Sequence, residues 1–458
     1  MLPIEQACFW LANLPPHPVH ALAGTVRADV AIVGAGLTGL WTALFLKELD
    51  PAREVAVVEQ GIAAWGASGR NAGMLAETVD HGHAAAIEHF GEAEAARLAR
   101  LGEKNVAEMI AFLAERGVDC DFEPTGRMMV ALTEAQVLEA QRAVETAARL
   151  GVHTYAFRDR EAVQAEVHSP LYRGAVSVRG GGILDPAKLT DGLRREAERR
   201  GVTVYERSPV VAVRTHGSGA SVETAGGRID ASRVVLATSA YTHRLLPRVA
   251  RWFLPLWDYI LVSEPLDERQ WHAVGWRGRQ GISDGRTFFN YYRPTRDGRV
   301  LWGTSEAVYY RGDRVGPECE HSEPHYAALR ESWRRHFPQL ADLRFEYAWG
   351  GAICSTTRLT PFFGHAHDGR VLYGLGFTGH GLGTTRIAGR ILAHLALERR
   401  SDLLDLTLVR RKPFPLPPGP LRGFAVDRVT RDLRRVDEGG APSVFLRLLD
   451  RLGIGFSS

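Results

Sequence analysis

Three glycines near the amino end, Gly34, Gly36 and Gly39, lie between an apolar run and a helical pattern. In this spacing the first glycine allows a tight turn, the second lets backbone N–H groups approach a pyrophosphate, and the third lets the helix pack closely on the strand. Glu59 ends the next apolar run, where a carboxylate can accept hydrogen bonds from ribose hydroxyls and would repel a 2′-phosphate. The flanking strand, helix and acid argue against a chance glycine turn. They predict an adenine dinucleotide and disfavour NADP.

A second glycine-rich loop begins at Gly376 and opens a helix that we expect to run to about Leu397. One dinucleotide motif does not explain it. A helix N-terminus offers free N–H groups and a positive dipole end, which suit a delocalised negative charge. A reduced flavin carries such a charge around N1 and its C2 carbonyl, whereas a nicotinamide does not. This loop therefore favours FAD over NAD.

Aromatic residues gather between Trp252 and Trp302 in a segment that reads as strands. On a strand Phe289, Tyr291 and Arg293 share one face, so that face could roof a pocket, although sheet packing explains the same pattern. The candidates for the substrate side are Tyr259, Tyr291, Tyr292, Arg293, Arg358 and His380. Simpler roles for two of them stay open, because His380 could pack in its loop and Arg358 could pair with a carboxylate.

Size and composition restrict the class of protein. A chain of 458 residues is long enough for two domains and an appendage. A formal charge of +3 with 24% charged residues gives no reason to expect nucleic acid as a partner. The four cysteines are scattered, which argues against a metal site, a redox dithiol or a disulfide framework: Cys8, Cys120, Cys319 and Cys354. The sequence shows neither a secretory signal nor an apolar stretch of twenty residues, so we expect a cytoplasmic protein.

Helices are expected over residues 91–116, 134–150 and 187–200, and short strands near 202–205, 210–214 and 233–237. The stretch from Lys412 to Pro420 is rich in proline, and a basic amphipathic segment follows from about Leu421 to Arg435. We expect this tail to clasp the outside of a domain. The alternative is contact with a membrane or a partner.

Taken together, the motifs resemble the FAD-dependent D-amino-acid oxidase-like (DAO) family. The matching segments are the Gly34 turn with Glu59, 66–73 (Gly-Ala-Ser-Gly-Arg-Asn-Ala-Gly), 237–241 (Ala-Thr-Ser-Ala-Tyr) and 376–381 (Gly-Phe-Thr-Gly-His-Gly). Residues 68–73, Tyr291-Tyr292-Arg293, Asp297-Gly298-Arg299 and the proline-rich tail resemble the branch that contains gamma-glutamylputrescine oxidoreductases.

This resemblance implies an α/β fold, with a Rossmann-like FAD-binding domain of the DAO/glutathione-reductase type and an inserted α+β substrate domain built on a mixed sheet. The expected boundaries are 25–85, 155–250 and 345–400 for the FAD domain, 86–154 and 251–344 for the substrate domain, and 401–458 for the helical, proline-rich tail. The resemblance also implies non-covalent FAD held by Gly34, Gly36, Leu37, Thr38, Gly39, Glu59, Gln60, Ala67, Ser68, Arg70, Asn71, Ala72, Gly73, Val210 or Val211, Ala237, Thr238, Gly376, Gly379, His380, Gly381, Leu382 and Gly383.

Two departures from the family pattern narrow the substrate. Cys354 stands where many members that act on amino acids have an arginine that clamps the substrate carboxylate. Gly383 stands near the place of a lysine with the same role in sarcosine oxidases. We therefore expect an amine without an α-carboxylate, unless Arg293 or Arg358 rebuilds the clamp. Cys354 also leaves open a covalent flavin link.

The predicted activity is oxidative deamination of a primary or secondary amine, with hydride transfer to flavin N5, imine hydrolysis, and oxygen as the acceptor that yields hydrogen peroxide. Leu301 occupies the approximate place of the lysine that helps oxygen react in sarcosine oxidases. An amine or D-amino-acid dehydrogenase that uses quinone or another acceptor therefore stays open, and its tail would contact a membrane. Further alternatives are an NAD-dependent dehydrogenase, which the second glycine loop disfavours, and a non-catalytic flavoprotein subunit.

Overall fold

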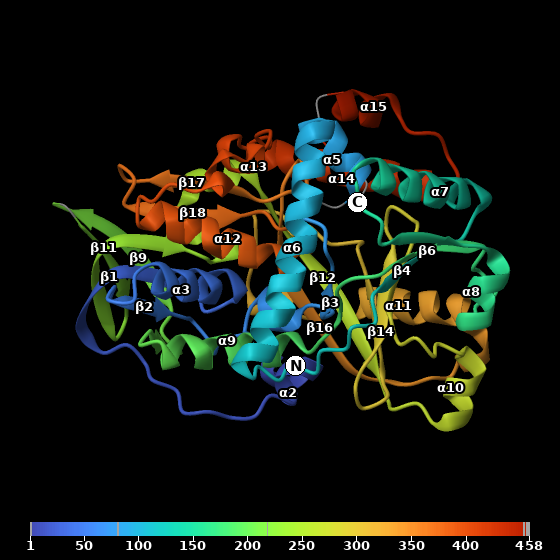
Figure 1. Ribbon diagram of the computed structural model, residues 1–458, viewed down its shortest axis with the longest axis horizontal. Helices are drawn as coiled ribbons and strands as arrows, with labels where there is room; N and C mark the ends of the chain where they lie inside the picture. The colour runs from blue at the N-terminus through green and yellow to red at the C-terminus, as the bar shows by residue number, and fades with distance from the viewer. Residues whose placement is uncertain (1, 80–81, 218, 452–453, 455–458) are drawn as a thin grey trace.

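The computed structural model describes residues 2–79, 82–217, 219–451 and 454. Within these residues two large sheets dominate the molecule. Figure 1 shows the first sheet with helices α3 and α12 at the left, the second sheet with α8, α10 and α11 at the right, and the long helix α6 between them. The α/β architecture expected from the sequence is confirmed.

The first sheet has the order β17-β18-β11-β1-β2-β8, and β9 and β10 extend it from β11. Strand β1 is parallel to both β11 and β2, with Val33 opposite Leu236 and Val58. Parallel strands buried on both faces read as continuous apolar runs, as residues 30–33 and 55–58 do. The strands are β1 (Gly24–Val33), β2 (Val55–Val58), β8 (Thr203–Tyr205), β9 (Val210–His216), β10 (Gly219–Thr224), β11 (Gly227–Leu236), β17 (Phe362–Ala366) and β18 (Val371–Leu375).

Helix α3 (Leu37–Leu49) joins β1 to β2 and packs against α12 (Gly381–Ala396). The helices approach closely because Gly389 of α12 lies against Trp41, where a Cβ would come within 2.6 Å of the Trp41 Cβ. Helix α9 (Pro186–Arg199) also packs on α3, and the Asp185 side chain caps its first turn. These contacts fix the N-termini of α3 and α12 relative to each other.

The second sheet is mixed and has the order β16-β12-β15-β14-β13-β4-β6-β5. Its strands are β4 (Arg127–Ala131), β5 (Tyr155–Arg158), β6 (Gly174–Val178), β12 (Leu254–Ser263), β13 (Gly281–Asp284), β14 (Asn290–Pro294), β15 (Val300–Thr304) and β16 (Phe345–Ser355). The accompanying helices are α5 (His83–Phe90), α6 (Glu92–Arg116), α7 (Glu134–Arg149), α8 (Arg160–Glu166), α10 (Glu268–Val274) and α11 (Glu323–His336). Helix α11 packs on β12 and β15.

The membership of this sheet differs from the expected domain boundaries. Strands β5 and β6, assigned above to the FAD domain, belong to this second sheet: β6 pairs with β4, and β5 pairs with β6 at the edge of the sheet. Strand β16 pairs along its length with β12, so the return to the first sheet begins at β17. The sequence of a short strand does not show which sheet the strand joins, because strand pairing depends on side-chain packing across the whole face of the sheet.

The tail forms α13 (Thr407–Arg410), α14 (Gly419–Asp437) and α15 (Val444–Arg451). It is anchored to the second sheet, since Asp437 accepts hydrogen bonds of 2.8 Å from the backbone N–H groups of Thr287 and Phe288. Arg422 and Arg434 pair with Asp313 and Glu306. In the described part of the chain, no helix combines the length and apolar character needed to cross a bilayer.

Candidate active site

A cavity of about 1230 Å³ extends from the carboxyl ends of β1, β2 and β11 to one face of the second sheet. This is where ligands bind in open parallel sheets. Most of the predicted cofactor residues line it: Gly34, Gly36, Leu37, Thr38, Glu59, Gln60, Ala67, Ser68, Arg70, Asn71, Ala72, Gly73, Val210, Ala237, Thr238, Gly379, His380, Gly381 and Leu382. The structure thus brings segments from four parts of the sequence around one hollow.

The glycine turn between β1 and α3 has a geometry that side chains would obstruct. Gly34 has a φ of +106°, and a Cβ there would lie 2.7 Å from the carbonyl oxygen of Ala237. A Cβ on Gly36 would meet the Ser68 Oγ at 2.7 Å. Gly39 does not line the cavity, and it lies so close to the Gly34 carbonyl that a Cβ would approach it to 2.0 Å. This cradle fits a pyrophosphate at the N-terminus of α3.

Glu59 lies at the end of β2 and ties the turn together. Its Oε2 accepts a hydrogen bond from the Ala35 N–H at 2.9 Å, and its Oε1 accepts one from the Gly61 N–H at 3.0 Å. Burial raises the pKa of this carboxyl. Val210 lines the cavity nearby, whereas the Val211 side chain is 66% exposed. Of these two alternatives for the adenine contact, Val210 is therefore the one at the cavity.

The segment after β2 carries α4 (Ala67–Arg70) into the cavity wall. Arg70 is buried, and its Nη1 donates to Glu320 Oε1 at 2.8 Å. Its Nη2 has no hydrogen-bond partner among the described residues, so it can serve a bound acceptor. Asn71 holds the loop through bonds from its Nδ2 to Ala67 O and Ser68 O. These groups fit a polar ring system lying against the loop.

The second glycine loop ends at His380, the residue before α12. Burial, with a smaller contribution from the charge of Arg127, lowers the pKa of His380 to about 4. The imidazole is therefore neutral at pH 7. Gly376 and Gly383 do not line the cavity. Gly376 has a φ of +88°, and the Gly383 carbonyl accepts a hydrogen bond from Asn105.

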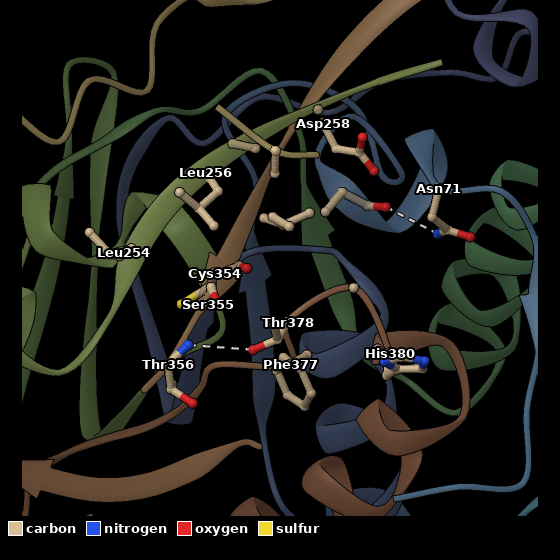
Figure 2. A pocket seen from close by; sticks show the side chains of 18 of the residues that line it. Asn71, Leu254, Leu256, Asp258, Cys354, Ser355, Thr356, Phe377, Thr378 and His380 are labelled. Atoms are coloured by element: carbon tan, nitrogen blue, oxygen red, sulfur yellow. Dashed lines mark hydrogen bonds between the residues drawn. The ribbon is translucent and has the colours of Figure 1, made fainter. Parts of the chain in front are cut away.

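The second sheet supplies the opposite wall. Figure 2 shows Leu256 and Asp258 of β12 on one side of the pocket and Phe377, Thr378 and His380 of the second glycine loop on the other. Tyr291, one of the predicted substrate residues, lines this wall and donates a hydrogen bond of 2.5 Å from its hydroxyl to Asp258 Oδ2. Burial raises the pKa of Asp258 to about 7. Most of the remaining wall is apolar: Leu254, Leu256, Ile260, Phe289 and Ile353.

Of the predicted substrate residues, Tyr291 and His380 line the cavity, and the other four do not. Tyr259 points to the far side of β12, where its hydroxyl bonds Tyr310 and the Cys319 carbonyl. The Tyr292 hydroxyl pairs with the Tyr172 hydroxyl in the core.

The two candidate clamp arginines are likewise bound to protein groups. The Nη1 of Arg293 donates to Leu184 O at 2.6 Å and to Gly73 O at 3.2 Å. Burial lowers the pKa of Arg293 to about 10. Arg358 donates from its guanidinium to the carbonyls of Pro361, Leu408 and Arg411, beside the tail. Arg293 thus supports the loop that carries Gly73, and Arg358 fastens the start of the tail.

Several lining residues were not predicted from the sequence. Asp258 is the most distinctive of them. The sequence does mark it, because it is the one acidic residue in the apolar strand 254–263. The tail was also expected on the outside, yet α14 places Leu421, Ala425, Val429 and Leu433 against the cavity. Their i, i+4 spacing marks an apolar helix face. The spacing shows amphipathicity but does not show what the face covers.

A model of the family described as FAD dependent oxidoreductase (DAO) matches residues 29–395. The chain belongs to this family, and its cofactor is FAD. It is therefore an FAD-dependent oxidoreductase of the amine and amino-acid oxidase type. The cradle at Gly34 and Gly36, the acid at Glu59 and the unpartnered Nη2 of Arg70 fit that cofactor.

Curated relatives span nearly the whole chain. A probable oxidoreductase OrdL from Rhizobium meliloti (strain 1021) is 29% identical over 90% of this chain and 94% of its own length. The gamma-glutamylputrescine oxidoreductase of Escherichia coli (strain K12) is 29% identical over 95% and 96%. Among solved structures, glycine oxidase from Geobacillus kaustophilus superimposes with a TM-score of 0.70 at 22% identity, covering 84% of this chain and 99% of that one. At this identity, the similarity to the glycine oxidase structure shows a shared fold and nothing more.

Proposed function

We propose that this protein oxidatively deaminates a primary or secondary amine that lacks an α-carboxylate. Bound FAD would supply the oxidant, because its N5 takes a hydride from the carbon beside the amine nitrogen. The resulting imine would hydrolyse in water to a carbonyl compound and an amine or ammonia. The observation that carries this proposal is that the cavity offers an amine a carboxylate and an apolar wall, while its cationic side chains are engaged elsewhere.

Four arginines line the cavity, and each has an acceptor within the protein. Arg70 and Arg127 pair with Glu320 and Glu77, both buried or half-buried acids. Arg286 pairs with Asp284, whose pKa is lowered to about 2 through hydrogen bonds and charges from Arg286 and His336, against the effect of burial. Arg244 donates to the carbonyl of Val315. None of the lysines described by the structure lines the cavity.

A substrate carboxylate that took Arg70, Arg127 or Arg286 as its partner would therefore compete with an existing ion pair. Breaking a buried pair leaves an unpaired charge and costs several kcal/mol, roughly 3–5. Cys354, where the family clamp arginine is expected, lies in the wall with only 2% of its surface exposed. These features support an amine over an α-amino acid.

The chain's residues also favour the neutral amine that hydride release requires. The wall formed by Leu254, Leu256, Ile353 and Phe377 is apolar, and a low-polarity site disfavours an isolated ammonium ion. Helix α14 covers part of the cavity with Leu421, Ala425, Val429 and Leu433, which limits the entry of water. His380 is neutral at pH 7 and so adds no positive charge near the flavin loop.

We further propose that FAD is held without a covalent bond. Cys354 is the one cysteine of the described residues that lines the cavity, and burial raises the pKa of its thiol well above the usual range. Thiols in such surroundings are inert, because the thiolate is the nucleophile. Denaturing the protein in acid should therefore release all of its flavin into solution. Yellow colour that stays with the precipitate would contradict this proposal.

Anaerobic titration tests the function. Under argon, a panel of primary and secondary alkylamines should bleach the oxidised-flavin absorbance of the purified holoenzyme, and air should restore it with formation of hydrogen peroxide. No bleaching by any amine would contradict the proposal.

A second candidate is a dehydrogenase that uses quinone, which the lack of a described lysine in the cavity wall favours. Leu301, at the approximate place of the expected lysine, is fully buried in an apolar cluster that also contains Trp349. Flavin that an amine bleaches and air does not reoxidise, but a soluble quinone does, would select this candidate.

A further inference from the structure

Asp258 has surroundings unlike those of the other acids in the cavity wall. Its Oδ2 accepts a hydrogen bond of 2.5 Å from the Tyr291 hydroxyl, and its Oδ1 accepts one of 2.8 Å from the Tyr259 N–H. In contrast, Glu59 closes the glycine turn and Asp284 binds Arg286. The part of Asp258 that is not buried faces the cavity.

No cation balances this carboxylate within the described part of the chain. A charged side chain of α4 lies close by, since Arg70 packs against Gly351, the residue paired with Asp258 across β12 and β16. Arg70 is already bonded to Glu320. From β14 the facing group is the Tyr291 hydroxyl, which is neutral at pH 7 because burial raises its pKa further. An unpaired buried carboxylate is costly, so its presence in a ligand cavity calls for a ligand.

We propose that Asp258 is the recognition group for a positively charged nitrogen of the substrate. The proposal rests on the function proposed above and defines its substrate class: an alkylamine that enters as the ammonium ion and carries an apolar chain. Asp258 would accept a hydrogen bond from the N–H of the ammonium group on binding. It would then take that proton onto its carboxylate before hydride release, so that the nitrogen reacts as the neutral amine. The chain would lie along the apolar side of the cavity, between Leu256 on β12 and the Val429 face of α14.

The pKa of Asp258, raised to about 7, is consistent with this role. At neutral pH about half of the unliganded sites would hold a proton, and an ammonium ion beside the carboxylate would favour its charged form. Binding of a cation at pH 6 should therefore release close to one proton for each site, and binding of a neutral ligand should release none. Tyr291 and the Tyr259 N–H are the groups that compete for the same oxygens.

The test uses a ligand that binds but cannot react. 2-Methylhexan-2-amine has no hydrogen on the carbon beside its nitrogen, so no hydride can leave it. 2-Methylhexan-2-ol is its neutral counterpart of the same shape. Each is titrated at pH 8 into FAD-loaded wild type, Asp258→Asn and Asp258→Glu, and binding is followed by the shift of the flavin absorbance spectrum. A charge-assisted hydrogen bond corresponds to roughly a tenfold or greater preference for the amine.

We expect wild type to prefer the amine by at least about tenfold, Asp258→Asn to lose that preference, and Asp258→Glu to keep part of it. The matched control Glu139→Gln, which removes an exposed negative charge on α7, should behave as wild type. An unchanged preference in Asp258→Asn would overturn the proposal, as would a wild type without preference. Bleaching by 1-hexylamine is scored separately. If 1-hexylamine does not bleach the flavin while wild type still prefers the amine to the alcohol, the proposed oxidation is wrong and the proposed recognition by Asp258 is supported.

Discussion

Replacing Asp258 by asparagine should stabilise the folded protein at pH 8 and leave its stability nearly unchanged at pH 4. The carboxyl has a pKa of about 7 in the folded protein against 3.8 for the ordinary group. Below pH 3.8 it is protonated in both states and costs nothing extra. Between pH 3.8 and 7 the unfolded chain loses this proton while the folded protein keeps it, so the free energy of unfolding falls as the pH rises. The loss is complete above pH 7.

The size of the effect follows from the two pKa values. At roughly 1.4 kcal/mol for each pKa unit, the change from 3.8 to about 7 corresponds to an upper limit of about 4 kcal/mol. Asparagine cannot ionise, and it keeps a carbonyl oxygen for the Tyr259 N–H. Guanidinium denaturation of the FAD-loaded wild type and variant, with FAD held in fixed excess, should show a midpoint difference that grows from pH 4 to pH 8.

A matched variant separates charge from packing. Tyr291→Phe removes the hydroxyl that stabilises the carboxylate, so it should raise the pKa of Asp258 further and lower stability most at high pH. A midpoint difference for Asp258→Asn that is the same at pH 4 and pH 8 would refute the reasoning, because it would mean that the carboxyl does not titrate differently in the folded and unfolded states.

Three further variants test the cofactor site and the tail. Glu59→Ala removes both acceptors that close the glycine turn, so FAD affinity should fall by roughly 2–4 kcal/mol, measured by reconstitution of the apoprotein; unchanged flavin content after gel filtration would contradict this. Arg293→Ala frees the Gly73 and Leu184 carbonyls and should lower flavin content and flavin reduction together; loss of reduction alone would instead indicate substrate contact. Asp437→Asn weakens the anchor of α14 and should raise the access of iodide to the flavin in fluorescence quenching, whereas quenching equal to that of wild type would show that α14 does not close the cavity.

The parts of the fold that depend on local sequence were predictable. Gly34, Gly36 and Glu59 specify the dinucleotide turn through backbone geometry that few other residues allow, and the structure places them together as expected. The helix after Gly381 was predictable for the same reason, because its capping loop is glycine-rich. The family resemblance extended this to the discontinuous first sheet and the mixed second sheet.

The parts that depend on long-range packing were not predictable. Arg293 and Tyr291 share a strand face, yet Tyr291 reaches the cavity while Arg293 lies under Gly73, because the segment that covers Arg293 comes from another part of the chain. The apolar face of α14 was visible as a pattern, but its docking over the cavity depends on Asp437 meeting the backbone at Thr287. Asp258 matters because of what surrounds it, and one sequence does not show that.

Stopped-flow reduction of the holoenzyme under argon tests the central claim most directly, with pentylamine and the two enantiomers of norleucine as substrates. Norleucine differs from pentylamine only by a carboxylate on the reacting carbon. Three of the four arginines of the cavity are already paired with acids, and the fourth donates to a backbone carbonyl. Pentylamine should therefore reduce the flavin with a second-order rate constant, the limiting reduction rate divided by Kd, at least about 100-fold greater than that of either enantiomer. Faster reduction by norleucine would contradict the account and identify an amino-acid oxidase.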